Sequence, residues 1–185
     1  HTVETRRVSV ASDGIEANDI SHIPAISADG RYVAFQSAAS NLVSGDTNGW
    51  NDVFVHDLLT SVTTRVAAPP GDATGNSGAK RPRISAHGRY VAFSSDVSKL
   101  VPEDTDQYRD IFIYDRVAQQ IEELSVARDG TQANNRSQKC SISGDGRFVA
   151  FQSLASNLVA DDTNQNSDIF VYDRGSEAHT ITITE

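Results

Sequence analysis

Short runs of apolar residues, rather than long amphipathic stretches, dominate the hydrophobic pattern of this chain. Three runs read Tyr-Val-Ala-Phe or Phe-Val-Ala-Phe, at positions 32–35, 90–93 and 148–151. Three further runs, rich in aliphatic and aromatic residues, occupy positions 53–56, 111–114 and 169–172. Runs that are apolar on both faces are typical of strands covered on two sides. No segment shows a helical period of adequate length, so the pattern predicts an all-β protein.

These runs belong to an internal repeat, which is the first feature to seek in a sequence. Asp46 lies 58 residues before Asp104, and the same step leads on to Asp162 without a gap. The step also relates Gly30, Gly88 and Gly146; Phe35, Phe93 and Phe151; Asp52, Asp110 and Asp168; and Asp57, Asp115 and Asp173. The chain therefore contains three tandem copies of one unit.

Each unit is predicted to hold four antiparallel strands. In the first copy they are residues 23–27, 32–37, 53–56 and 63–67. The dipeptide Asp29-Gly30 between the first two strands favours a type I′ hairpin turn. Four strands in a period of about 40 to 60 residues describe a propeller blade. We therefore expect a β-propeller of three tandem blades at about 21–67, 79–126 and 137–185, with an open solenoid or a sandwich as alternatives.

The blade sequence resembles the signature of TolB-like (PD40) propellers. The resemblance lies in residues 26–35, Ile-Ser-Ala-Asp-Gly-Arg-Tyr-Val-Ala-Phe, and in residues 110–115, Asp-Ile-Phe-Ile-Tyr-Asp. It implies a six-bladed ring, usually bacterial and extracytoplasmic, that acts as a binding scaffold or as an accessory domain of a larger enzyme. The chain departs from the family in two ways: it has a long connection between the second and third strands, and three blades form only half of such a ring.

Three blades leave the outer faces of the first and last sheets without a neighbour. Residues 5–10 align with the fourth strand of a blade, because Val8 is followed 58 residues later by Val66; we expect them to form an extra outer strand. Soluble monomers rarely expose large apolar faces. Either two chains close a ring by symmetry, or the chain is a segment of a longer array. We expect a homodimer or a larger assembly in solution.

The charge of the chain narrows the class of partner. The formal net charge is -9 and the pI is about 4.9, and the sixteen Lys and Arg residues are scattered. Phosphate backbones require clustered basic residues, so nucleic acid is not expected as a partner. No apolar run reaches the roughly 20 residues that span a membrane. Cys140 is the single cysteine, so no intrachain disulfide forms.

An acidic motif recurs in the connection between the second and third strands. Its members are Asp46, Asn48 and Asp52 in the first copy, Asp104, Asp106 and Asp110 in the second, and Asp162, Asn164 and Asp168 in the third. Oxygen side chains at alternating positions, followed by a later carboxylate, resemble the first half of a Ca²⁺ loop, although the Gly and the distal Glu are absent. The alternative is that these residues form Asx-turns with the backbone. The pattern leaves both interpretations open.

Polar loops are expected to gather at one end of the propeller. In an antiparallel blade, the connection between strands two and three shares its end with the crossover to the next blade. The crossovers carry Asn18, Asn76 and Asn134, with Asp13-Gly14 and Asp129-Gly130 nearby. Trp50 and Tyr108 occupy the same place in this rim as Asn166. These two aromatic residues are candidates for stacking on a sugar ligand, or they cover the neighbouring blade as ordinary loop residues.

No catalytic constellation is visible in the sequence. The histidines at positions 1, 22, 56, 87 and 179 do not share a place in the repeat, and no Gly-x-Ser-x-Gly elbow is present. The sequence therefore predicts a non-catalytic TolB-like propeller module, secreted or periplasmic, that binds a protein or glycan partner, with Ca²⁺ as the candidate ion for its acidic loops. The alternative is an accessory propeller part of a larger secreted hydrolase or lyase.

Overall fold

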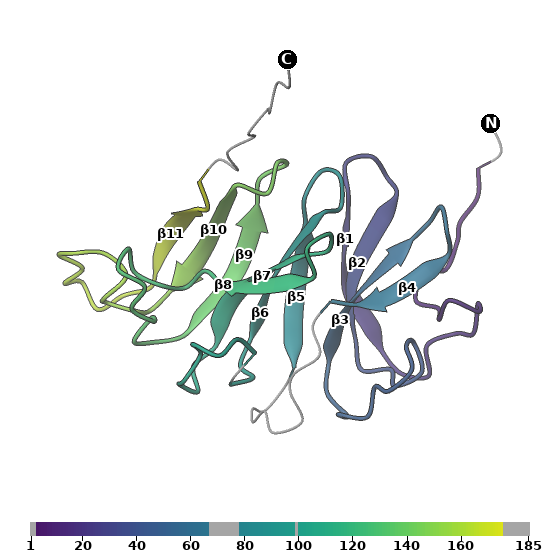
Figure 1. Ribbon diagram of the computed structural model, residues 1–185, viewed down its shortest axis with the longest axis horizontal. Coiled ribbons are helices and arrows are strands. Elements are labelled where there is room, and N and C mark those ends of the chain that lie inside the picture. The colour runs from purple at the N-terminus through teal and green to yellow at the C-terminus, as the bar shows by residue number, and fades with distance from the viewer. Residues whose placement is uncertain (1–2, 67–77, 99, 176–185) are drawn as a thin grey trace, which may run out of the picture.

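The computed structural model describes residues 3–66, 78–98 and 100–175, and these residues form three antiparallel sheets without a helix. The strands are β1 (Ser21–Ile26), β2 (Tyr32–Ser37), β3 (Asp52–Asp57), β4 (Val62–Arg65), β5 (Ala79–Ile84), β6 (Tyr90–Ser95), β7 (Asp110–Asp115), β8 (Gln120–Glu123), β9 (Ser137–Ile142), β10 (Phe148–Ser153) and β11 (Asp168–Asp173). Within each sheet the strands follow one another in sequence order. The sheets stand side by side like the blades of a partial propeller (Figure 1). Below, β1–β4, β5–β8 and β9–β11 are the first, second and third blade.

The central strands of each blade explain the doubly apolar runs of the sequence. In the first blade, β2 pairs with β3 in a continuous register that places Phe35 opposite Phe54. Their rings stack with centroids 5.8 Å apart, and the equivalent pairs of the other blades lie 5.9 Å apart. Nearly every residue of β2, β3, β6 and β7 is buried, because these strands carry apolar side chains on both faces.

The hydrophobic core lies between the blades. One cluster joins Ala34 and Val55 of the first blade to Phe93 and Phe112 of the second. Another joins Ile111 and Ile113 of the second blade to Val149 and Phe151 of the third. Phe93 and Phe151 therefore pack between blades. Phe35 is also buried, but it packs with Phe54, Ala39 and Leu42 on the first blade and contacts Ala17 of the N-terminal segment.

The first hairpin of each blade differs from the predicted type I′ turn. The amide of Gly30 donates to the carbonyl of Ser27, and Gly30 has a φ of 71° whereas Asp29 does not have a positive φ. This is a type I turn followed by a left-handed glycine, the three-residue hairpin with a bulge. The Asp29 carboxylate stabilises it by accepting bonds from the Ser27 hydroxyl and the Arg31 amide. The second blade forms the same turn with His87 in place of Asp29, so the turn type does not depend on the aspartate.

The inner strand of each blade contains a bulge at one repeated position. Ile23, Arg81 and Lys139 have φ values of 52°, 55° and 56°, and the pairing register shifts beside each of them. A left-handed conformation is unfavourable for a β-branched residue such as Ile23. Its recurrence at the 58-residue step shows that the blade geometry imposes it, since a bulge bends the strand and increases its twist.

The N-terminal segment does not form the expected outer strand. Residues 5–9 have no regular secondary structure, and Val10 makes only an isolated bridge with Glu16. The segment nevertheless resembles the crossover that follows the outer strand of the second blade. The carbonyl of Ser9 accepts a bond from the amide of Ala17, as the carbonyl of Ser125 does from the amide of Ala133. Among the described residues, no strand pairs with residues 5–9. The predicted fourth strand of the last blade, residues 180–184, lies outside the described residues.

Candidate functional site

The polar loops gather at one end of the blades, as expected; this end, built from the connections between second and third strands and from the crossovers, is called the lower rim. In the first blade the side chain of Asn18 bonds to Ser40, while the amide of Asn18 donates to Asn41. Asn134, Ser156 and Asn157 repeat these bonds in the third blade. Asn76 lies outside the described residues. The lower rim is thus a hydrogen-bonded surface shared by crossovers and loops.

The middle residue of each acidic motif forms an Asx-turn. The side-chain oxygens of Asn48, Asp106 and Asn164 accept bonds of 2.8, 2.7 and 2.6 Å from the backbone amides two residues later. These amides belong to Trp50, Tyr108 and Asn166. The turn therefore sets the position of the aromatic side chain on the lower rim. Tyr108 is exposed there, whereas Trp50 is only half-exposed.

In the first blade an arginine neutralises the acidic motif. The guanidinium of Arg65, on β4, lies 3.0 Å from Asp46 and 3.3 Å from Asp52. The side-chain amide of Asn48 donates a further bond of 3.0 Å to the carboxylate of Asp52. Burial raises the pKa of Asp52 to about 6, and the nearby Asp46 adds to that, while Asn48 and Arg65 oppose the shift. This cluster carries its own cation.

The second blade has the same geometry but a different charge. Carboxylate oxygens of Asp104, Asp106 and Asp110 all lie within 4.8 Å of one another. Glu123, on β8, occupies the repeat position of Arg65. Within the described part of the chain, no ion pair joins any of these four carboxyl groups. No cationic side chain of the described residues therefore pairs with the acidic cluster of the second blade.

Burial shifts the titration of this cluster strongly. Removal from water raises the pKa of Asp110 to about 8, of Glu123 to about 7 and of Asp104 to about 6. The neighbouring carboxylates add to each of these shifts because like charges disfavour the ionised form. A single hydroxyl bond from Ser125 opposes the shift of Asp110. A group of carboxyls held this far from its ordinary ionisation is a candidate functional site.

The third blade is more open. Asp162 and Asp168 are half-exposed, and Asn164 donates a bond of 3.0 Å to Asp168, as Asn48 does to Asp52 in the first blade. The repeat counterpart of Glu123 is residue 181, which lies outside the described residues. The three motifs therefore share a backbone turn but differ in charge and burial.

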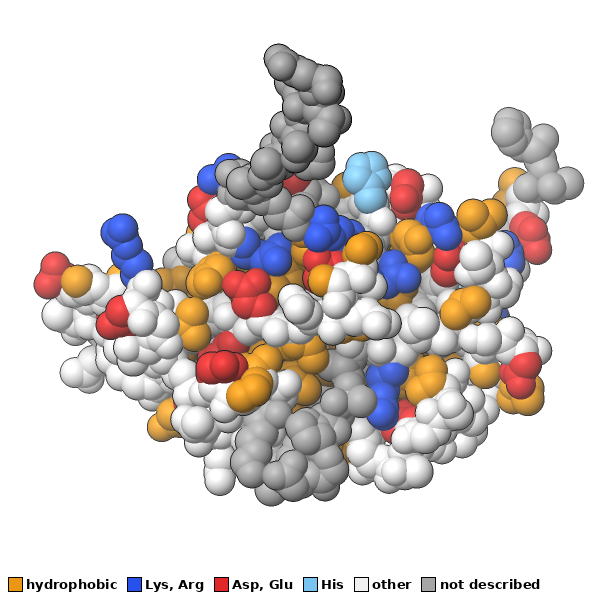
Figure 2. Space-filling view, in the orientation of Figure 1, with side chains coloured by type: hydrophobic (Ala, Val, Ile, Leu, Met, Phe, Trp, Pro, Cys, Tyr) orange, Lys and Arg blue, Asp and Glu red, His pale blue; other side chains and the backbone are white. Residues whose placement is uncertain are grey.

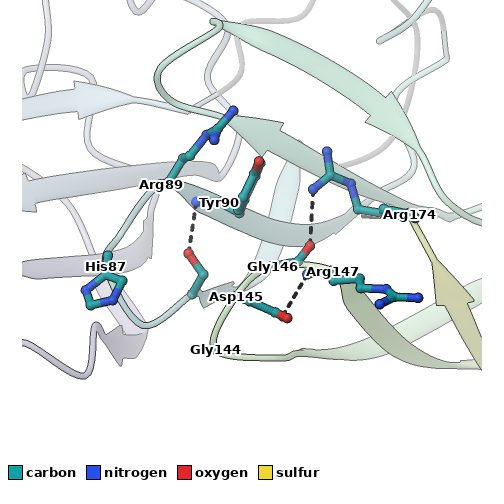
Figure 3. Close-up of a pocket in the computed structure, with 10 residues that line it drawn as sticks. His87, Arg89, Tyr90, Gly144, Asp145, Gly146, Arg147 and Arg174 are labelled. Carbon is teal, nitrogen blue, oxygen red and sulfur yellow. Dashed lines mark hydrogen bonds between the residues drawn. The ribbon is translucent and has the colours of Figure 1, made fainter. Parts of the chain in front are cut away.

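The opposite end, formed by the hairpins, is called the upper rim, and arginines gather along it (Figure 2). Here each blade contacts the aromatic residue of the blade before it. Tyr90 of the second blade lies between Arg89, at 4.8 Å, and Arg174 of the third blade, at 4.5 Å (Figure 3). Arg174 also donates to the carbonyl of Gly146, beside an open pocket of about 380 Å³. The first and second blades repeat this contact with Tyr32 and Arg116.

Glycine makes the contact possible. A Cβ at Gly146 would lie 2.1 Å from the ring of Tyr90, and a Cβ at Gly88 would lie equally close to Tyr32. Gly30, the counterpart in the first blade, has nothing within 4 Å of that position. Conversely, Phe148 of the third blade has Arg147 at 4.6 Å but receives no such hairpin from the described residues.

One face of the third blade is apolar and open. Ile169 and Val171 are 72% and 64% exposed. Their counterparts in the other blades, Val53, Val55, Ile111 and Ile113, are buried against the next blade. The open face of the third blade is therefore equivalent to the faces of the first and second blades that pack against the next blade.

The solved structures that resemble this chain are β-propellers. No family model matches the chain, and no curated protein sequence matches it significantly. Among solved structures, TolB from Acinetobacter baumannii is 19% identical with a TM-score of 0.51, over 85% of this chain and 30% of that one. A putative TolB from Agrobacterium tumefaciens is 18% identical with a TM-score of 0.54, over 86% and 48%. The β-propeller domain of the Trilobed protease from Pyrococcus furiosus is 14% identical with a TM-score of 0.53, over 84% and 39%.

The chain has the TolB-like propeller fold. It spans less than half the length of the TolB chains that it matches. Among the described residues of this TolB-like unit, there is no helix with the length and hydropathy that crossing a membrane requires.

The blades of this chain differ in the charge of one outer-strand residue, which the sequence motifs did not single out. Arg65 and Glu123 stand 58 residues apart, so the repeat alone places them at one position with opposite charge. Their contact with the acidic motif could not be read from the period, because it depends on the outer strand lying beside the third strand. The arginine contacts of the upper rim were missed for the same reason.

Proposed function

We propose that the chain is a non-catalytic TolB-like propeller module that assembles through the open face of its third blade and binds a protein or glycan on its lower rim. The observation that carries the proposal is the open face around Ile169 and Val171, which repeats the surface that receives a blade elsewhere in the chain. Extended apolar patches on soluble domains mark interaction sites.

The occupant that fits this face is the first blade of a second copy. Each contact between blades places a hairpin glycine against an aromatic ring: Gly88 against Tyr32 and Gly146 against Tyr90. No hairpin glycine of the described residues packs against Phe148. Conversely, no aromatic ring packs against Gly30, where a Cβ would have nothing within 4 Å. The two ends of the array are thus complementary, and two copies related by symmetry would satisfy both.

The lower rim offers the binding surface of such an assembly. Tyr108 is exposed on a turn fixed by Asp106, and Trp50 occupies the same place in the first blade. Aromatic side chains beside hydrogen-bonding groups suit a sugar or a protein partner. The resemblance to TolB-like propellers favours a secreted or periplasmic setting for this binding.

Sedimentation of the purified chain tests the assembly. We expect a species of twice the 20.0 kDa chain mass at micromolar concentration. Val171→Glu places a charge on the open face and should give the monomer, whereas Val117→Glu changes an equally exposed valine on a turn of the second blade and should leave the assembly intact. A monodisperse wild-type monomer, or assembly that survives Val171→Glu, would contradict the proposal.

A second candidate is an accessory propeller of a larger secreted hydrolase or lyase. It is favoured by the likeness to the propeller domain of the Trilobed protease, of which the matched part makes up 39%. In that case blades elsewhere in the same polypeptide would cover Ile169 and Val171. The purified 185-residue chain would then remain a monomer whose open face binds a hydrophobic dye, and Val171→Glu would reduce the dye signal.

A further inference from the structure

We propose that the second blade holds one Ca²⁺ ion between Asp104, Asp106 and Asp110, with Glu123 beside it at the repeat position where the first blade has Arg65. The site is specific to this blade, because the first blade fills the equivalent space with a residue of its own. It is independent of the assembly proposed above, since all four residues belong to one sheet and its loop.

The first and second blades differ at two positions around this acidic motif. In the first blade, Asn48 and Arg65 direct N–H donors at the carboxylate of Asp52. In the second blade, Asp106 and Glu123 stand at those two positions. Both donors are thus replaced by acceptors around the same backbone turn. A bound cation would supply the positive charge that Arg65 supplies in the first blade.

The second blade also contains buried oxygens without a hydrogen-bond partner among the described residues. Asp104, Asp110 and Glu123 are 3%, 1% and 8% exposed. Their atoms Oδ1, Oδ2 and Oε1, respectively, have no hydrogen-bond partner. Burying an unpaired polar group is costly, and buried charges in proteins are paired or coordinate a metal. These three oxygens therefore indicate a ligand rather than a turn, which the Asx-turn of Asp106 alone would not.

The donor set and its dimensions select a hard cation. All candidate ligands are carboxylate oxygens, which suit Ca²⁺ and Mg²⁺ rather than softer metals. Oxygens that each lie about 2.4 Å from a Ca²⁺ ion are at most about 4.8 Å apart. The oxygens of the three aspartates meet that limit. Mg²⁺ requires a smaller octahedral shell and retains several waters, so a cluster of four carboxyls favours Ca²⁺.

The ion would join three elements of the lower rim. Asp104 and Asp106 belong to the loop between β6 and β7, Asp110 begins β7, and Glu123 ends β8. Gln132 of the next crossover donates to Glu123 and accepts bonds from Thr105 of the loop. A bound ion would therefore fix the loop that presents Tyr108, and would couple it to the start of the third blade.

Calorimetric titration of the chelator-treated chain with CaCl2 tests the site. We expect one ion per chain, with MgCl2 binding at least ten-fold more weakly. Glu123→Arg installs the arginine of the first blade and should abolish Ca²⁺ binding while the chain stays folded. Asp106→Asn, which installs the Asn48 counterpart, should weaken binding at least ten-fold. Asp46→Asn in the first blade is the matched control and should leave the titration unchanged.

Thermal unfolding supplies a second readout. Ca²⁺ should raise the melting temperature of the wild-type chain, because a ligand that binds only the folded state stabilises it. Glu123→Arg should melt above the wild type in chelator and should not respond to Ca²⁺. The proposal is overturned by the absence of Ca²⁺ binding, by binding that persists in Glu123→Arg, or by binding that Asp46→Asn removes.

Discussion

Single residues decide how each copy of the blade handles buried charge. Arg31, Arg89 and Arg147 lie beside Asp57, Asp115 and Asp173 in all three blades, with contacts of 2.7 to 2.8 Å. These pairs are fixed by the repeat. Arg65 and Glu123 break it, and together with the change from Asn48 to Asp106 they turn a cluster paired with an arginine into a wholly acidic one. A charge without a buried partner is costly, so the rest of the site must respond to these changes.

Phe93 is the residue at which core packing is best tested. Its side chain is fully buried between the first and second blades and stacks on Phe112. Phe93→Ala should lower the free energy of unfolding by about 3–5 kcal/mol, because it leaves a cavity between two sheets. Leu59→Ala removes an exposed side chain and should change it by less than about 0.5 kcal/mol. A loss below about 1 kcal/mol for Phe93→Ala in urea denaturation would contradict this packing.

His56 should give the stability a dependence on pH. The side chain is buried, and its Nδ1 lies 2.8 Å from the hydroxyl of Thr63. Burial lowers the pKa of His56, and the charge of Arg6 lowers it further, against a smaller opposite effect of Asp57. The unfolded chain then binds a proton more readily than the folded one, so stability should fall as the pH drops below about 6.5.

His56→Tyr tests this dependence, since tyrosine occupies the position in the other two blades. The urea midpoint of the variant should vary less between pH 7.5 and pH 5 than that of the wild type. Parallel curves for the two proteins would show that His56 does not contribute.

At the scale of elements, the hairpin of each blade serves two purposes. It reverses the chain with a left-handed glycine, and in the second and third blades it also receives the aromatic ring of the preceding blade. The first blade has the turn without the contact. The chain thus contains the same hairpin with and without a neighbouring ring. Comparing the two separates the backbone strain of a glycine substitution from the loss of packing that it causes.

Gly30→Ala and Gly88→Ala form a matched pair for this separation. Both glycines have nearly the same φ, 71° and 72°. Gly30→Ala should cost about 1–2 kcal/mol, the penalty of a left-handed conformation for a residue with a Cβ. Gly88→Ala should cost more, because its Cβ would meet the ring of Tyr32 at 2.1 Å. Equal losses in chemical denaturation would mean that Tyr32 moves aside without cost.

At the scale of the molecule, the three blades form an array in which each contacts only its neighbours. The second blade is covered on both faces by the other two. The first blade is partly covered by the N-terminal segment, through Ala17 and through the bonds that Thr63 donates to Ser12 and Val10. The third blade has an open face. In such arrays, stability is approximately the sum of blade terms and interface terms.

Hydrogen exchange should report this gradient. At concentrations where the chain is monomeric, amides of β6 and β7 should exchange more slowly than those of β10 and β11, because local opening is easiest where one face is uncovered. As the concentration rises and the proposed assembly forms, the amides of β10 and β11 should gain protection while those of β6 and β7 change less. Uniform protection in the monomer would contradict an array with one open end.

Periodicity by itself determined most of the fold. The 58-residue step, the doubly apolar strands and the repeated glycine turns indicated three antiparallel units, and antiparallel order placed the polar loops on one rim. Local patterns suffice for these features because strand pairing within a blade joins segments that follow one another in the chain.

Only the tertiary structure decided the turn type, the path of residues 5–10 and the charge balance of the acidic motifs. Asp29 lies in a type I turn that the dipeptide alone does not reveal. Among the described residues, the N-terminal segment pairs only through the bridge between Val10 and Glu16. The acidic motifs look equivalent in sequence, yet Arg65 reaches Asp46 from 19 residues away because β4 lies beside β3. Electrostatic energy depends on distance and burial in space, and neither follows from position in the repeat.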